Sequence, residues 1–256
     1  MGITLSMTGR IDSCVLVTMR VRAPGVRPLL PRPLELMTLE SRGAEWAFVN
    51  VVLCHVRRMR PTWAPAAMGV SYHHVAYRLL VRARKRDGTE MRGLYFLRSD
   101  ADSGIVCSMG NRLSDFRFHR ASKITMTLDA DAGMKWSCAV DGGAPARVRG
   151  KVLDPHEFTP DRDTVFRHEE QAKAFLKYTP VGVCPDASGR IMRVAEVDRN
   201  EDAWHERPMA LDECRFEHFA ALGIQDARVE RAVSVAPIDY RWRLGRVVGL
   251  AVDDRE

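Results

Sequence analysis

The polar residues that could perform chemistry fall into three groups, and none of them matches a known catalytic motif. The sequence contains no phosphate-binding glycine loop, dinucleotide fingerprint, zinc-protease helix or Gly-x-Ser-x-Gly turn. The three groups are Ser71–His74, Arg112–Ala121 and the single residue Arg20. Any site must therefore be assembled from side chains that the fold buries together.

The first group contains two adjacent histidines, His73 and His74, near the start of a long apolar run. Because alternate side chains of a strand face opposite sides, only one of them can point into a core. A metal clip made from both is geometrically poor, so no metal and no other cofactor is predicted. A pocket histidine and an ordinary core or surface histidine both stay open as interpretations.

The second and third groups depend on which face of a strand is buried. Alternation places Phe116 and Phe118 on one face and Arg117 and His119 on the other. Either an aromatic floor or a charged wall could face the interior, and the usual burial ranking favours the aromatic rings. A buried Arg20 would be costly without an anion, so an inward Arg20 predicts a carboxylate clamp, whereas an outward one has no such role.

The elements that must position these residues are mainly strands. Val, Ile, Leu, Thr and aromatic residues dominate several runs, which Gly, Pro or Asp bound: 13–21, 45–56, 70–84, 90–97, 123–128, 134–140, 191–197, 229–235 and 240–244. Turns at 86–88, 129–133 and 141–143 are typical of antiparallel hairpins. The pattern predicts a meander that curls or closes.

Helical signals are few. One turn is expected within 24–31, where prolines stop it, and a second helix is expected over 168–178. The run 102–113 begins with good capping residues and spaces Ile105, Met109 and Leu113 four apart, which predicts a helix buried against the sheet. Loops are expected around 155–163 and 180–189, and with no polar linker we expect one domain, 1–256.

Composition narrows the class of protein. The 256 residues are 46% hydrophobic, enough for a sizeable core, and no stretch approaches the roughly 18 apolar residues of a membrane span. The first residues lack a secretory pattern, so a cytoplasmic location and no membrane partner are predicted. The six cysteines are scattered without a Cys-x-x-Cys pair, which favours buried thiols over structural zinc or disulfides.

The net charge of +6 raises the question of nucleic acid. The arginines, however, alternate with apolar residues over 78–84, which is typical of the wet face of a strand, and the basic run 82–86 leads into a hairpin turn. A nucleic-acid partner is therefore not favoured. The alternative to a small-molecule binder remains a structural or interaction protein, including a weak basic nucleic-acid binder.

The segment 17–35 resembles the opening strand, short helix and Leu-Pro-containing turn of the acetoacetate decarboxylase-like superfamily. Similarity continues through 75–82 and 95–102, and weakly through 175–178 and 202–204, so it spans most of the chain. More specifically, the sequence resembles an uncharacterised bacterial branch of that superfamily, a family defined only as a domain of unknown function. The resemblance implies a mainly β (α+β) fold, a central antiparallel β-barrel around an apolar pocket with a few short helices outside, and homo-oligomers.

The resemblance also implies a mechanism from which this sequence departs. True decarboxylases form a Schiff base between a lysine and a β-keto acid, assisted by an arginine and a glutamate. Arg20 falls on the arginine position and His74 (or His73) on that of the glutamate, but Phe118 and His119 stand where the two lysines would be. Imine decarboxylation is therefore not expected.

We expect instead a barrel that binds a small, organic, anionic ligand. Its candidate lining residues are Arg20, His73, His74, Arg98, Phe118 and His119. If the protein is an enzyme, His119 or His74 would move a proton while Arg20 holds a carbonyl or carboxylate substrate.

Overall fold

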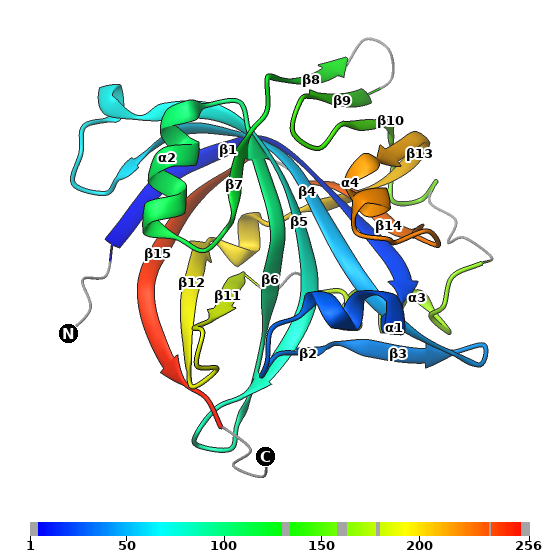
Figure 1. Cartoon of the computed structure of the whole chain (residues 1–256). Coiled ribbons are helices and arrows are strands. Elements are labelled where there is room, and N and C mark those ends of the chain that lie inside the picture. The colour runs from blue at the N-terminus through cyan, green and yellow to red at the C-terminus, as the bar shows by residue number, and fades with distance from the viewer. Residues whose placement is uncertain (1–4, 130–133, 158–162, 178–179, 236, 252–256) are drawn as a thin grey trace.

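Strands make up most of the chain in the computed structural model, which describes residues 5–129, 134–157, 163–177, 180–235 and 237–251 (Figure 1). The strands are β1 (Leu5–Arg22), β2 (Glu35–Leu36), β3 (Thr38–Ser41), β4 (Ala44–Pro61), β5 (Val70–Arg84), β6 (Glu90–Ala101), β7 (Phe118–Arg120), β8 (Lys123–Asp129), β9 (Lys135–Asp141), β10 (Ala146–Val152), β11 (Val181–Pro185), β12 (Ile191–Arg199), β13 (Glu206–Phe216), β14 (Arg228–Val235) and β15 (Ile238–Gly249). The prediction of a mainly β fold is confirmed.

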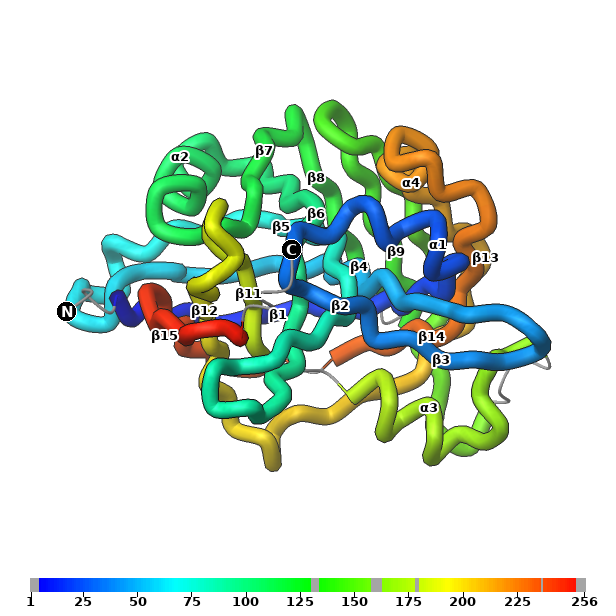
Figure 2. The backbone as a smooth tube through the Cα atoms, turned by 60° about the horizontal axis from the view of Figure 1, so that its bottom comes forward, coloured from blue at the N-terminus to red at the C-terminus, as the bar shows by residue number. Residues whose placement is uncertain are grey.

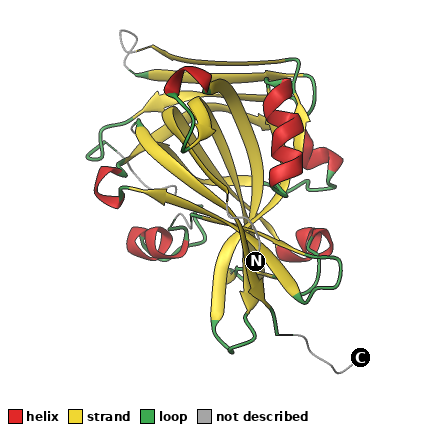
Figure 3. Ribbon diagram, turned by 90° about the vertical axis from the view of Figure 1, so that its left-hand side faces the viewer, coloured by secondary structure: helices red, strands yellow, loops and turns green. Residues whose placement is uncertain are grey.

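The helices are short. They are α1 (Ala23–Val26), α2 (Gly104–Leu113), α3 (Glu169–Phe175) and α4 (Glu217–Ala221), with single 3-10 turns η1 (Arg27–Leu29), η2 (Ala66–Met68) and η3 (Glu201–Ala203). Ser103 caps α2 by accepting a hydrogen bond from the backbone of Val106, and His168 caps α3 in the same way through Gln171. Figure 2 shows α2 and α3 on opposite sides of the molecule, and Figure 3 shows the helices outside the strands.

Strand pairing closes on itself. β4, β5, β6, β11, β12, β15 and β1 follow one another through hydrogen-bonded pairs, and β1 pairs back with β4. We call this circuit the ring. Its pairs are antiparallel except that β11 runs parallel to β6, which differs from the wholly antiparallel prediction. The parallel pair arises because a long excursion, which contains α2 and the second sheet, separates these two strands in sequence.

A second sheet packs against the outside of the ring. β1 continues past β15 to pair with β14, which leads through β13 to β10, β9 and β8. One face of β1, β4 and β5 packs on this sheet, where Trp136 is buried and its indole donates to the hydroxyl of Ser13 at 3.2 Å. The opposite face of the same strands points into the ring. Alternation along each strand thus supplies two separate cores.

Aromatic side chains close one end of the ring. Phe166 stacks on Phe48 with ring centroids 5.5 Å apart, and Phe175 of α3 lies 5.2 Å from Phe48. The loop that carries Phe166 is held by Arg20, whose guanidinium donates to Glu230 and Asp163 at 2.6 Å each. These side chains fill the described part of this end of the ring, and α2 and η2 lie at the opposite end.

Two predictions about local structure are wrong. Residues 181–185 form β11 rather than part of a loop, because Val181 and Val183 alternate with smaller residues and fit the gap between β6 and β12. Helix α2 lies within the predicted residues, but Ile105, Met109 and Leu113 are exposed and Cys107 is its only buried residue. The turn at 129–133 lies mostly outside the described residues, and those at 86–88 and 141–143 connect hairpins as predicted.

Candidate small-molecule pocket

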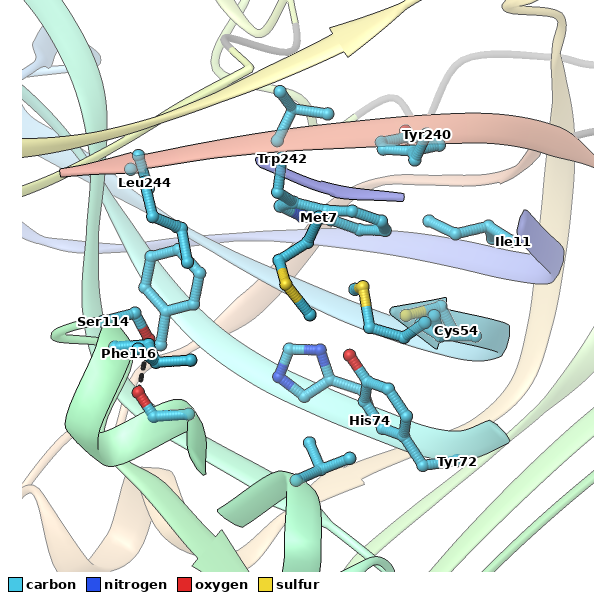
Figure 4. Close-up of a pocket in the computed structure, with 18 of the residues that line it drawn as sticks. Met7, Ile11, Cys54, Tyr72, His74, Ser114, Phe116, Tyr240, Trp242 and Leu244 are labelled. Carbon is cyan, nitrogen blue, oxygen red and sulfur yellow. Dashed lines mark hydrogen bonds between the residues drawn. The ribbon is translucent and has the colours of Figure 1, made fainter. Parts of the chain in front are cut away.

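An apolar cavity of about 550 Å³ lies inside the ring, a volume typical of small-molecule sites. Most of its walls are aliphatic and aromatic side chains that point inward from strands of the ring and from the segment between α2 and β7. They include Ile11, Leu16, Val52, Val56, Leu94, Phe96, Phe116, Phe118, Trp242 and Leu244. Figure 4 shows Met7, Trp242 and Leu244 on one side of this space, with Tyr72 and Phe116 across from them.

Sulfur and imidazole side chains form a row across one wall. Cys14 of β1 is paired in register with Cys54 of β4, and Cys54 is paired with His74 of β5. All three line the cavity, so their side chains share one face of the sheet. Burial raises the pKa of both thiols, that of Cys54 to about 12, so they are neutral at physiological pH. Among the described residues, no group of three or more His, Cys, Asp or Glu side chains is arranged to hold a metal ion.

His74 is the central polar group of the wall. Its ring stacks on Phe118 with centroids 5.2 Å apart, and Figure 4 shows it pointing into the cavity beside Tyr72. Burial and then repulsion from Arg78 lower the pKa of His74 from 6.5 to about 3, so the imidazole is neutral. Its Nε2 is buried and makes no hydrogen bond with the described residues. A buried polar atom without a hydrogen bond costs free energy, and a ligand group that hydrogen-bonds to Nε2 would remove this penalty.

Arg78 supplies positive charge at the inner end of the cavity. It is four residues after His74 on β5, lines the same cavity and is only 4% exposed. Its guanidinium donates to the side-chain oxygen of Asn50 and lies over the ring of Phe96, 5.8 Å from the centroid. No acidic side chain is among the described residues that line the cavity, whereas Arg60 and Arg78 are. The local charge therefore favours an anionic ligand group.

The opposite end of the cavity forms a mouth between η2 and α2. Trp63 and Met68 border it from one side, and Ile105, Met109 and Leu113 border it from the other. These α2 residues were expected in the core. They are exposed instead because α2 sits beside the open end of the ring, where its apolar side faces the mouth rather than a packed sheet.

Two of the predicted ligand-binding residues, His74 and Phe118, line the cavity. Phe116 joins them, so the aromatic face of residues 116–119 points inward and Arg117 and His119 lie on the other face. This settles the alternative that the sequence left open. Alternation also holds for the histidine pair, because His73 points away from the cavity and bonds Asp102 through Nδ1 at 2.7 Å.

The other three predicted residues do not line the cavity. Arg20 faces the inside of the ring, but it lies at the end that Phe48 and Phe166 fill. There its guanidinium forms ion pairs with Glu230 and Asp163. Arg98 forms two hydrogen bonds to Asp100 at 2.8 Å on the outer face of β6. His119 lies on that outer face, where burial and the charge of Arg98 lower its pKa. The structure thus brings neither Arg20 nor His119 together with His74.

Lysine is missing from the cavity walls. Every lysine of the sequence lies within the described residues, and none of them lines the 550 Å³ cavity. Lys177 borders a separate hollow of about 20 Å³ that Asn50 also lines. No lysine amine is therefore placed to form an imine with a ligand in the cavity.

Sequence reasoning missed Arg78, Cys14 and Cys54. Arg78 was interpreted as part of a wet strand face, which is correct for Arg82 and Arg84 but wrong for Arg78. Its spacing of four from His74, within an otherwise apolar stretch, was the available signal, because both residues must share a face of β5. The cysteines were recognised as buried but not as neighbours, since their pairing depends on the register of β1 and β4.

Comparisons with known proteins identify a family for this chain and solved structures with a similar fold. The family model described as an uncharacterized conserved protein, DUF2071, matches residues 9–238. No curated protein matches the sequence. Among the described residues, no helix is long and apolar enough to cross a lipid bilayer.

Solved structures with a similar fold share little sequence. Acetoacetate decarboxylase from Legionella pneumophila is 13% identical, with a TM-score of 0.54 over 95% of this chain and 87% of that chain. An acetoacetate decarboxylase-like enzyme from Sphingomonas wittichii is 14% identical, with a TM-score of 0.55 over 96% and 92%. The enduracididine biosynthesis enzyme MppR, complexed with the condensation product of pyruvate and imidazole 4-carboxaldehyde, is 16% identical, with a TM-score of 0.54 over 98% and 90%.

These likenesses concern the fold, because identities this low carry no residue roles. The family match covers most of the chain, and the fold matches cover nearly all of it. The chain belongs to the uncharacterised DUF2071 family and has the acetoacetate decarboxylase-like fold.

Proposed function

We propose that the protein binds a small, largely apolar organic anion, such as a medium-chain carboxylate, inside a closed β-barrel. The observation that carries this proposal is the combination of apolar walls with Arg78 at the inner end of the cavity. The ligand's anionic group would contact Arg78, and His74 would donate a hydrogen bond from Nε2 to the same group. Its apolar part would extend toward Trp63 and α2.

The proposed ligand suits the energetics of the cavity. Burial of apolar surface contributes about 25 cal/mol per Å², so a hydrocarbon chain gains more than a compact polar metabolite would. The buried guanidinium of Arg78 then selects among apolar molecules, because it rewards a carboxylate over a neutral head group. The apolar chain and the carboxylate would therefore each contribute to the free energy of binding. A core filled by the protein's own side chains would bind no such ligand.

Binding is proposed rather than catalysis through an imine, because no lysine lines the cavity. His74 is also a poor general base, since an imidazole with a pKa of about 3 takes up a proton weakly at neutral pH. A nucleic-acid partner gains no support from the basic hairpin, where Arg82 pairs with Glu35 and Glu90.

The test compares decanoate with decanol by calorimetry on the full chain and on Arg78→Met. We expect Arg78→Met to weaken decanoate binding by about 10- to 150-fold, the range for losing a hydrogen bond to a charged group, and to leave decanol binding unchanged. Arg82→Met, on the same strand but exposed, is the matched control. Arg78→Lys keeps the charge and should retain part of the preference. Equal decanoate affinity in wild type and Arg78→Met would refute the proposal.

A further inference from the structure

The most exposed large apolar side chains of the described residues gather at the mouth of the cavity. Trp63 is 78% exposed, Met68 65% and Ile105 61%. Met109 and Leu113, on the same side of α2, are exposed as well. We call these five residues the rim. The rim comes from two separate segments, yet all of it borders one cavity.

Single exposed apolar residues are ordinary on a protein surface, but a contiguous set is not. A small molecule inside the cavity covers only the inner side of the rim, so the outer surface of Trp63, Met68 and Ile105 stays in water. The remaining large exposed apolar residues, Leu128, Ile191 and Val247, do not line the cavity. The exposed apolar surface is therefore concentrated at the one end through which a ligand enters.

The charges around the rim are positive. Arg58 and Arg60 precede Trp63, and Arg112 lies on α2 next to Leu113. Within the described ranges, none of these three arginines forms an ion pair with an acidic side chain. The nearby carboxylates have partners of their own, because Asp12 forms ion pairs with Arg10 and Arg57, and Asp102 is hydrogen-bonded to His73. An apolar centre with a cationic margin calls for a partner that is apolar and anionic.

We propose that the rim docks the protein onto a lipid bilayer that contains anionic headgroups. The apolar side chains would enter the boundary between headgroups and acyl chains, where tryptophan is favoured, and the arginines would contact lipid phosphates. A second copy of this chain fits less well, because a twofold contact would bring the same arginines against one another. Docking in this way turns the mouth of the cavity toward the source of apolar ligands.

This proposal differs from the sequence expectation of no membrane partner. That expectation rested on the lack of a long apolar run, and a peripheral surface needs no such run. Trp63 and Ile105 are distant in sequence, and only the placement of α2 beside η2 brings their segments to the same end of the ring (Figure 1).

The experiment is sedimentation of the full chain with vesicles of phosphatidylcholine alone or mixed equally with phosphatidylglycerol. We expect binding to the mixed vesicles only, with loss on added salt. Ile105→Asp should abolish this binding, whereas Leu128→Asp, the same kind of change at an exposed apolar residue away from the mouth, should not.

The double variant Arg58→Gln and Arg112→Gln should reduce partitioning onto the mixed vesicles by ~fivefold per arginine. Arg84→Gln with Arg86→Gln, in the β5–β6 hairpin, is the charge-matched control.

Several outcomes overturn the proposal. They are a lack of binding to anionic vesicles, equal binding by Ile105→Asp and wild type, and dimerisation without lipid that Ile105→Asp abolishes. Capture by an acidic protein in place of vesicles would also reject it. Vesicle binding and ligand binding can be tested separately. Arg78→Met should lose the preference for decanoate but sediment with vesicles like wild type.

Discussion

Replacing His74 with phenylalanine should remove a defined part of the pH dependence of stability. Burial holds the pKa of His74 near 3 in the folded protein, against 6.5 when exposed. Between these values the unfolded chain binds a proton that the folded chain does not, so the free energy of unfolding falls as the pH drops below 6.5. At pH 5 the loss is about 2 kcal/mol, since ~1.5 pH units cost ~1.36 kcal/mol each.

His74→Phe keeps a ring that can stack on Phe118 but cannot titrate. The assay is urea unfolding of wild type and variant at pH 7 and pH 5. For each protein, the free energy of unfolding at pH 5 is subtracted from that at pH 7. His218, whose pKa is lowered to about 4, contributes equally to both proteins and cancels in this comparison. His74→Gln should give the same flattened difference. An identical pH dependence in wild type and both variants would show that His74 is not held neutral by burial.

The remaining predictions concern the closed end of the ring and the lysines. Arg20→Met should lower the free energy of unfolding by about 3–5 kcal/mol, because it strands the carboxylate of Glu230, only 1% exposed, without its partner. Its decanoate affinity should equal that of wild type, and a loss of affinity with unchanged stability would place Arg20 in the ligand site after all. Borohydride treatment with a panel of keto acids should leave the intact mass unchanged, because no lysine lines the cavity. A covalent adduct mapped to one lysine would contradict that reading.

Strands and helices were predictable from the sequence where their residue pattern is regular and a clear turn or cap marks their ends. β5 was predicted with its observed bounds, because its long apolar run ends at a recognisable Asp-Gly turn. The run 102–113 was likewise recognised as a helix from its cap and spacing. β10, β11 and β13 were missed, since segments that contain Gly, Pro or many charges acquire strand form only beside a neighbouring strand.

The site was harder to predict because orientation depends on closure of the ring. Alternation required that His73 and His74 face opposite sides, but only the pairing of β5 with β4 and β6 decides that His74 points inward. Arg20 satisfied the expectation of a buried arginine with an anionic partner, yet that partner is Glu230, 210 residues away in sequence. Local patterns contain no information about such a distant contact. The exposure of α2 was missed for the same reason, since its apolar side borders an opening.

The central claim is that the cavity holds an apolar anion with its charged end at Arg78. The most direct measurement is a crystal structure of the protein with a medium-chain carboxylate that carries bromine at its other end, located by anomalous scattering. The account predicts the carboxylate within hydrogen-bond distance of Arg78 and the bromine near Trp63 and α2. Bromine at the inner end, or density for the ligand only outside the ring, would contradict it.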